Sequence, residues 1–410
     1  MSIRRSLLLL SILMLLPLLL LSQVRVGADL LLAKEQSLIT GKRVGLITNH
    51  TALLADGRHL ADAIAALPDV KLVALFGPEH GVRGDAADGA TIGNGVDPKT
   101  GAPVYSLYGR INKPTDEMLK GVDVLLYDIQ DVGVRFYTFE STLILGMEAA
   151  AEHHIPYIVL DRPNPITGMR VEGPLRVDSL RSFVGWLPVP IAHGMTVGEL
   201  ATMANEEGWL AHGIKADLHV VRMEGWKRSM WYDETGLRWV KPSPNMATLR
   251  TAIVYPGTCL VEGISVAEGR GTDRPFEWLG APFIDGDRWA QALNGLALPG
   301  VHFEPITFVP KEIPGVASNP KFRDRHCSGV FVDVTDRNRY EAVRTGIAIL
   351  STIRSLYPDS VQWRGSIDRL AGTPDVRRAI DQGVDADSLC ARWKPEINRF
   401  RNIREKYLLY

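Results

Sequence analysis

The chain has 410 residues, of which 46% are apolar and 23% are charged, and its formal net charge is −1. This is the composition of an ordinary globular protein, and the length suits about two domains. The nearly neutral charge lacks the basic excess that binds phosphates, so we expect no nucleic acid among the partners.

The first 28 residues have the pattern of a secretory signal peptide. Arg4 and Arg5 precede an apolar run over 7–21, and the stretch ends in Val26-Gly27-Ala28, with small residues where signal peptidase needs them. The alternative is an uncleaved anchor, but the run is shorter than the roughly 20 residues of a membrane-spanning helix. We expect cleavage near Ala28, export to the periplasm or the medium, and no stable membrane insertion afterwards.

Predicted strands and helices alternate from residue 29 onwards. The expected order is strand 43–48, helix 57–67, strands 70–76, 104–108 and 123–127, helix 141–153 and strand 157–160. Continuous apolar runs separated by helices indicate a mostly parallel sheet that is covered on both faces. The first domain is therefore predicted to be a doubly wound α/β layer.

A second, smaller α/β domain is predicted beyond residue 255. Segments rich in Pro and Gly at 241–245 and 255–257 predict turns there. They are followed by a predicted strand at 329–334, a helix at 340–356 and a helical stretch from 374. We therefore divide the mature chain into a catalytic domain, 29–255, and a domain that completes the cleft, 256–410.

Polar side chains follow the predicted strands of the first domain. The strand ends carry the segments 48–50, 77–81, 128–131 and 161–165, which include Asn49. Because parallel strands deliver their carboxyl ends to one edge, we expect a ligand-binding cleft there. No glycine-rich phosphate loop follows the first strand, which disfavours nucleotide and dinucleotide cofactors. We expect neither a cofactor nor a metal.

Glu79 is the most suggestive single residue. Pro78 and Gly81 bracket it in a constrained turn directly after an apolar strand. A partly desolvated carboxyl group in such a position has a raised pKa, which suits a general acid. The alternative is a helix cap, but the segment after Glu79 is predicted to be a long loop, and long loops in compact domains often bind ligands.

Two further segments combine charge with aromatic or Arg side chains. The segment 128–139 holds two acids, Arg135 and Tyr137, and aromatic rings in a polar cleft suit sugar rings. The segment 262–275 holds two glutamates together with Arg270 and Arg274, which have the geometry to bind a carboxylate. The alternative for this second segment is a surface loop of ion pairs.

Nine segments together resemble the bacterial exo-β-N-acetylmuramidases, a family long known as a domain of unknown function. They run in order over much of the chain: FGPEHGVRG (76–84), VYSLYG (104–109), DVLLYDIQDVGVRFYTF (123–139), LDRPNPITG (160–168), VEGP (171–174), PIAHGMTVGELA (190–201), SPNM (243–246), YPGTCLVEG (255–263) and VAEGRGTDRPFEWLGAPF (266–283). The resemblance implies a Rossmann-like domain, a smaller C-terminal domain and an active site between them. It also implies hydrolysis of non-reducing terminal β-1,4-linked N-acetylmuramic acid from peptidoglycan fragments.

The family's catalytic glutamate maps onto Glu79, which would protonate the leaving glycosidic oxygen. Alternatives for the second group are the 2-acetamido group of the substrate and the carboxylates of Asp128, Asp131, Glu262 and Glu268. The lactyl carboxylate of muramic acid would be bound by Arg135, Arg270, Arg274 or His193. The full set of expected substrate contacts is Asn49, His80, Arg83, Arg135, Tyr137, Arg162, His193, Glu262, Glu268, Arg270 and Arg274.

Two other classes of protein remain as alternatives. An exported sugar-binding protein without catalysis has the same two-domain plan, and turnover of a chromogenic muramide separates it from an enzyme. A metal-dependent peptidoglycan amidase is disfavoured because the sequence shows no recognisable set of metal ligands.

Overall fold

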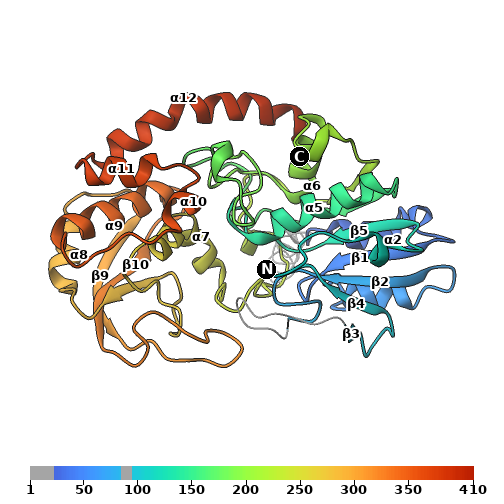
Figure 1. Ribbon diagram of the computed structural model, residues 1–410, viewed down its shortest axis with the longest axis horizontal. Coiled ribbons are helices and arrows are strands. Elements are labelled where there is room, and N and C mark those ends of the chain that lie inside the picture. Colours follow the sequence, from blue (N-terminus) through green and yellow to red (C-terminus); the bar gives the residue numbers. More distant parts are fainter. Residues whose placement is uncertain (1–22, 85–94) are drawn as a thin grey trace, which may run out of the picture.

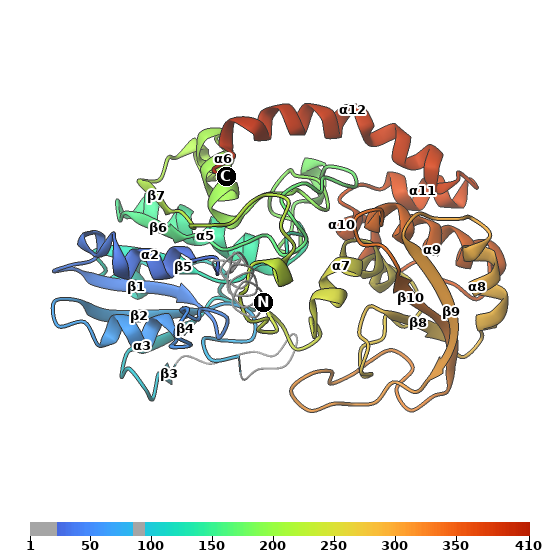
Figure 2. The same ribbon diagram turned by 180° about the vertical axis from the view of Figure 1, so that it is seen from behind.

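The computed structural model describes residues 23–84 and 95–410. It shows two units side by side, with a long C-terminal helix passing over both (Figures 1 and 2). The predicted signal segment up to residue 22 and most of the loop expected after Glu79 lie outside the described residues.

The first unit is built on a seven-stranded sheet of order β3-β4-β2-β1-β5-β6-β7. Neighbouring strands are parallel except β3 and β4, so the predicted doubly wound, mostly parallel sheet is confirmed. The strands are β1 (Arg43–Thr48), β2 (Lys71–Gly77), β3 (Gly95–Val96), β4 (Pro103–Ser106), β5 (Val124–Asp128), β6 (Tyr157–Leu160) and β7 (Leu218–Val221).

Both faces of this sheet are buried, which is why its strands read as continuous apolar runs. Leu125 and Tyr127 of β5 belong to one hydrophobic cluster, and Val124 and Leu126 belong to the other. Alternate side chains of a strand point to opposite faces, so β5 feeds both clusters. The helices of this unit are α2 (Gly27–Ala33), α3 (Leu60–Ala65), α4 (Asp116–Leu119), α5 (Thr138–Glu152) and α6 (Val197–Glu206).

The first unit begins before residue 29, which is the predicted start of the mature chain. The side chains of Val24, Val26 and Ala28 are buried. The backbone N–H of Val24 donates to the Thr235 carbonyl at 2.9 Å, and that of Gly27 donates to the Asp161 carbonyl at 2.8 Å. Val24–Ala28 is therefore part of the folded domain.

The second unit has a three-stranded antiparallel sheet of order β8-β10-β9. A smaller C-terminal α/β domain is thereby confirmed. Its strands are β8 (Trp278–Ala281), β9 (Val301–Phe308) and β10 (Cys327–Val334), and its helices are α7 (Leu249–Thr258), α8 (Gly286–Asn294), α9 (Ala342–Leu356), α10 (Ile367–Ala371), α11 (Asp375–Asp381) and α12 (Ala386–Arg404).

The turn predicted at 255–257 is wrong, because this segment is the last part of helix α7. Gly257 is needed there for close packing against α9. A Cβ atom at this position would lie 1.9 Å from the Ala342 carbonyl oxygen, and one at Gly346 would lie 2.4 Å from the Gly257 carbonyl oxygen. Because α7 packs on α9, residue 255 belongs with the second unit.

Helix α12 starts in the second unit and ends on the first (Figures 1 and 2). Near its end, the Arg404 guanidinium donates to the Gly194 carbonyl at 2.8 Å. The Tyr410 hydroxyl donates to Asp161 Oδ2 at 2.7 Å. Among the described residues, no helix combines the length and the apolar character that a membrane span requires.

Candidate active site

A cavity of about 190 Å³ lies between the two units, and we call it the central cavity. On one side it meets the segments that follow β2 and β5, and on the other it meets α7 and the 3₁₀ helix Cys259–Gly263. Its lining residues are Glu79, His80, Tyr108, Phe136, Tyr137, Thr138, Phe139, Val184, Ser243, Asn245, Met246, Tyr255, Cys259, Glu262, Arg270, Phe276 and Leu370.

Glu79 enters the central cavity from a tight turn after β2. The N–H of Gly81 donates to the Pro78 carbonyl at 2.9 Å, which closes the turn. His80 has a positive φ of 73°, a conformation that costs free energy for a residue with a side chain. The Thr138 hydroxyl, at the start of α5, donates to Glu79 Oε2 at 3.0 Å. The turn and this hydrogen bond together fix the position of the Glu79 carboxyl group.

A second carboxyl group reaches the same cavity from the second unit. Glu262 lies in the 3₁₀ helix Cys259–Gly263. Arg270 Nη2 donates to Glu262 Oε1 at 2.7 Å, and Arg270 Nε lies 3.5 Å from Glu268 Oε1. The Arg270 guanidinium also lies over the ring of Phe276, 5.1 Å from its centroid. The central cavity thus has one carboxyl group on each side.

Aromatic rings form much of the lining between these two groups. Tyr255 makes edge contacts with Phe136, Tyr137 and Phe276, with centroid distances of 5.3, 6.0 and 4.7 Å. Tyr137 was predicted to contact the substrate, whereas the other lining residues Tyr255, Phe276, Tyr108 and Asn245 were not. Tyr108, Tyr255 and Asn245 lie in the segments VYSLYG, YPGTCLVEG and SPNM, so the resemblance already contained a signal for them.

Two family models match the chain in sequence. The model described as exo-beta-N-acetylmuramidase NamZ, N-terminal, matches residues 44–250, and the corresponding C-terminal model matches residues 253–410. The chain belongs to the exo-β-N-acetylmuramidase NamZ family.

Similar proteins support this NamZ assignment. The peptidoglycan beta-N-acetylmuramidase NamZ of Bacillus subtilis (strain 168) is 47% identical over 390 residues, which are 95% of this chain and 92% of the relative. Two solved DUF1343 family proteins of Bacteroides fragilis NCTC 9343 share the fold. One has a TM-score of 0.87 at 37% identity and the other 0.79 at 35%. In both cases the match covers 95% of this chain and 99% of the other.

Several predicted residues of this NamZ-family chain lie outside the central cavity. Asp128 and Arg162 are buried and form an ion pair, with Arg162 Nε 2.5 Å from Asp128 Oδ1. Asn49 Oδ1 accepts hydrogen bonds from the N–H and the hydroxyl of Thr51, which form a local turn. Arg83 is bound by Asp62 and Asp97. These residues hold the loops after the strands in place, and none of them lines the cavity.

Asp131 and His193 also lie outside the central cavity, and they form a buried cluster with Glu140. Their ligand-type atoms lie within 4.8 Å of one another, as in a metal site. However, the Met195 N–H donates to His193 Nδ1 at 3.2 Å, so the ring proton sits on Nε2, 2.7 Å from Glu140 Oε1. This leaves no imidazole lone pair for an ion. Burial and the nearby Glu140 raise the pKa of Asp131.

Of the three Arg residues expected to bind the lactyl carboxylate, only Arg270 lines the central cavity. The buried Arg135 guanidinium donates to the carbonyls of Pro174, Val189 and Leu370 at 2.7–3.0 Å. Burial lowers the pKa of Arg135 to about 9. Arg274 is half exposed and pairs with Glu277 at 3.2 Å. Arg135 therefore joins the two units, and Arg274 lies outside the cavity.

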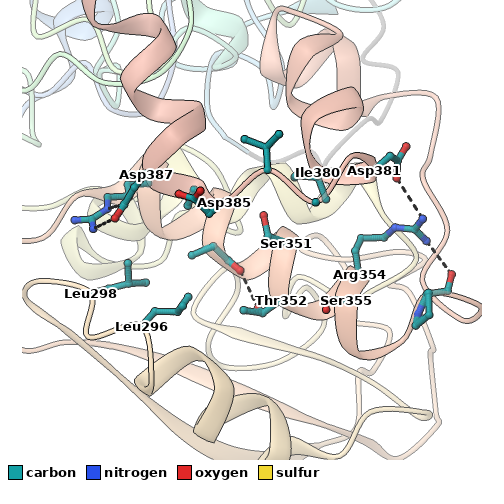
Figure 3. A pocket seen from close by; sticks show the side chains of 16 residues that line it. Leu296, Leu298, Ser351, Thr352, Arg354, Ser355, Ile380, Asp381, Asp385 and Asp387 are labelled. Carbon is teal, nitrogen blue, oxygen red and sulfur yellow. Dashed lines mark hydrogen bonds and ion pairs between the residues drawn. The ribbon is translucent and has the colours of Figure 1, made fainter.

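Two other hollows lie in the second unit. One, of about 450 Å³, shares Glu262 and Arg270 with the central cavity and also contains Glu268; we call it the outer hollow. Another, of about 500 Å³, lies between α9, α11 and the start of α12 (Figure 3). Arg354 pairs with Asp381 there and Arg344 pairs with Asp387, and none of the predicted site residues lines this hollow.

Proposed function

We propose that this chain is an exo-acting glycoside hydrolase that releases non-reducing terminal β-1,4-linked N-acetylmuramic acid from peptidoglycan fragments. Its Bacillus relative is named a peptidoglycan beta-N-acetylmuramidase and shares nearly the whole length. The observation that carries the proposal is the aromatic-lined cavity that joins Glu79 of the first unit to Glu262 of the second. Glycosidases commonly place two carboxyl groups on either side of the scissile bond.

Glu79 is the proposed general acid, and Glu262 is the proposed second group. Glu79 gives its proton to the glycosidic oxygen as the bond to the anomeric carbon breaks, and water finally supplies the hydroxyl group at that carbon. Glu262 faces the permanent cation of Arg270, which suits a carboxylate acting as base or nucleophile. Asp128 and Asp131 are buried outside the cavity, so we withdraw them from this role. The 2-acetamido group of the substrate remains the alternative to Glu262.

The size of the central cavity favours attack at a chain end. At about 190 Å³ it is smaller than the roughly 300–1,000 Å³ of typical ligand pockets. It therefore suits a single sugar ring, with the rest of the substrate outside.

Replacing Glu79 tests this function. Glu79→Gln keeps the shape of the side chain but removes the proton donor, so release of N-acetylmuramic acid from a disaccharide should fall about 10²–10⁴-fold. An aryl muramide should lose less, because its leaving group needs less protonation. By contrast, Glu262→Gln should slow both substrates alike.

The exposed Glu117 of α4 provides a matched control, and Glu117→Gln should turn over like the wild type. A Glu79→Gln variant within a few-fold of the wild type would remove Glu79 from the acid role. A wild-type protein that binds the disaccharide without turnover would instead be a sugar-binding protein.

We also propose that the protein is exported. Support comes from the two arginines and the apolar run at the start of the chain, and from the cell-wall polymer named for the relative. Because Val24–Ala28 packs into the first unit, we now place the cleavage site upstream of Val24 rather than at Ala28.

A further inference from the structure

The outer hollow opens beside the central cavity, and the two share the ion pair of Glu262 with Arg270. The central cavity suits one sugar ring, so the substituents of that ring must lie beyond it. The outer hollow, at about 450 Å³, is the larger adjoining space. Its lining residues are Glu262, Glu268, Arg270, Ala317, Ser318, Asn319, Pro320, Lys321, Arg364 and Ser366.

Most of the charges in the outer hollow already have partners. Arg270 lies between the carboxylates of Glu262 and Glu268, at 2.7 and 3.5 Å. Lys321 Nζ lies 2.9 Å from Glu268 Oε2 and donates to the carbonyls of Ile264 and Val266 at 2.8 Å. These two cations therefore balance the charge of the two carboxylates.

Arg364 differs from these cations. It is exposed, and its backbone N–H donates to the Gly263 carbonyl at 2.8 Å, which holds it next to the 3₁₀ helix that carries Glu262. Within the described residues, its guanidinium makes no hydrogen bond or ion pair. Arg364 and Lys321 line the same hollow, and the pKa of Lys321 is lowered by burial and, to a smaller extent, by the charge of Arg364. The outer hollow thus has an excess of one positive charge.

We propose that the outer hollow is a subsite for a carboxylate of the substrate and that Arg364 is its charged contact. A guanidinium presents a fork of N–H donors that matches a carboxylate. Ser318 and Asn319 are exposed beside it and offer further polar groups. The proposal rests on the proposed function, because the carboxylate comes from muramic acid. Its source is either the lactyl ether itself or a peptide attached to that ether.

The test compares substrates that differ only in this charge. The first probe is an aryl N-acetylmuramide with a free lactyl carboxylate, and the second is its neutral lactyl methylamide. The third is the muramoyl-L-alanine form, whose carboxylate belongs to the alanine and so lies one residue further from the sugar ring. In the wild type, kcat/KM should be higher for the free acid or the alanyl form than for the neutral amide. Whichever of the two is preferred identifies the source of the carboxylate.

Arg364→Met should reduce the preference for the charged substrate about 10-fold while leaving the neutral amide nearly unchanged. This is the low end of the roughly 10- to 150-fold expected for a hydrogen bond to a charged group, because Arg364 is exposed. Arg364→Glu should reverse the preference. Arg369→Met is the matched control, since Arg369 is exposed in α10 but lines neither hollow, and it should leave the ratio intact.

The subsite would be overturned if Arg364→Met left the ratio of kcat/KM between the charged substrate and the neutral amide unchanged. It would also be overturned if kcat/KM fell equally for all three substrates in a variant that folds normally. A loss of preference in Arg270→Met but not in Arg364→Met would assign the carboxylate to the central cavity and would also overturn it. Failure of the proposed function is distinguishable, because the wild type would then turn over none of the three probes.

Discussion

Asp131 shows how a polar residue at a strand end can serve the fold instead of a substrate. It follows β5 at the edge where ligands bind in open parallel sheets, which is why the sequence selects it. Its Oδ1 instead accepts the N–H of Gly133 at 2.6 Å, and the side chain is buried against Glu140 and His193. Glu79 follows β2 at the same edge of the sheet and lines the central cavity. The difference lies in the turn geometry, which residue type alone does not reveal.

Replacing Asp131 separates these roles. Asp131→Asn keeps the oxygen that Gly133 needs and removes one of two facing carboxyl groups, whose burial is costly. We expect kcat/KM within a few-fold of the wild type and an unfolding free energy at pH 8 that is equal or higher. Kinetics and urea unfolding at pH 8 measure both. A loss of activity of about 10²-fold or more would make Asp131 catalytic after all.

Asp128→Asn is the matched comparison for Asp131→Asn. Asp128 is equally buried but neutralises Arg162. Removing one partner of a buried ion pair typically costs about 3–5 kcal/mol, so this variant should unfold at clearly lower urea concentrations.

At the scale of elements, apolar patterns predicted the parallel sheet well and the second unit less well. Strands β1, β2, β5 and β6 are continuous apolar runs because both faces of the sheet are covered. Strand β9 was not predicted, because Pro305 interrupts it and exposed residues alternate along it. It is an edge strand that pairs only with β10, where Pro is tolerated. The end of helix α7, residues 255–257, was mistaken for a turn because Gly257 follows Pro256 there, and this glycine serves close packing against α9.

The N-terminal segment Val24–Ala28 leads to a prediction about processing. Cleavage after Ala28 would remove the buried side chains of Val24 and Val26 and the hydrogen bonds to Thr235 and Asp161. Fully burying a valine side chain stabilises a fold by about 1.5 kcal/mol or more, so a protein starting at Asp29 should be clearly destabilised. We therefore expect the mature N-terminus of envelope protein to lie upstream of Val24.

Mass spectrometry of the N-terminal peptide tests this directly. Purified versions that start at Gln23 and at Asp29 provide the control, and the shorter one should have a Tm lower by several degrees. A mature protein that starts at Asp29 with an unchanged Tm would show that the segment is dispensable.

At the scale of the whole molecule, the cleft depends on how the two units are held together. Glu79 and Glu262 lie on different units, so their separation is set by contacts between the units rather than by either unit alone. Helix α12 and the residues after it provide such contacts, since Arg404 binds the Gly194 carbonyl and the Leu409 N–H donates to Glu199. These partners are more than 200 residues apart in the chain. Local sequence patterns carry no information about such contacts. The two-domain plan was therefore predicted, but the contacts that hold the two units together were not.

Glu199 makes the contact between the C-terminal residues and the first unit sensitive to pH. It is buried at the start of α6, where it accepts hydrogen bonds from Arg228 at 2.7 Å and from the Leu409 N–H at 2.8 Å. Burial raises the pKa of Glu199 to about 7, although Arg228 opposes the shift. The folded protein therefore binds the Glu199 proton more tightly than the unfolded chain does. The stabilisation from this proton is complete below the unfolded pKa of 4.5, is lost as pH rises to about 7, and changes no further above that.

Glu199→Gln cannot ionise and should lack this part of the pH dependence. Urea unfolding of the variant and the wild type at pH 5 and pH 8 isolates the contribution of Glu199. Other titrating groups, such as His59, whose pKa is lowered by burial, contribute equally to both proteins. Losing the ion pair with Arg228 changes the unfolding free energy of the variant by a constant amount. Beyond that constant, the unfolding free energy of the variant should rise relative to that of the wild type between pH 5 and pH 8. The shift should be at most roughly 3 kcal/mol, as 1.36 kcal/mol per pKa unit requires. The exposed Glu117→Gln should follow the wild type at both pH values. Parallel curves for Glu199→Gln and the wild type would mean that Arg228 keeps Glu199 ionised throughout, and that the C-terminal connection does not respond to pH at this residue.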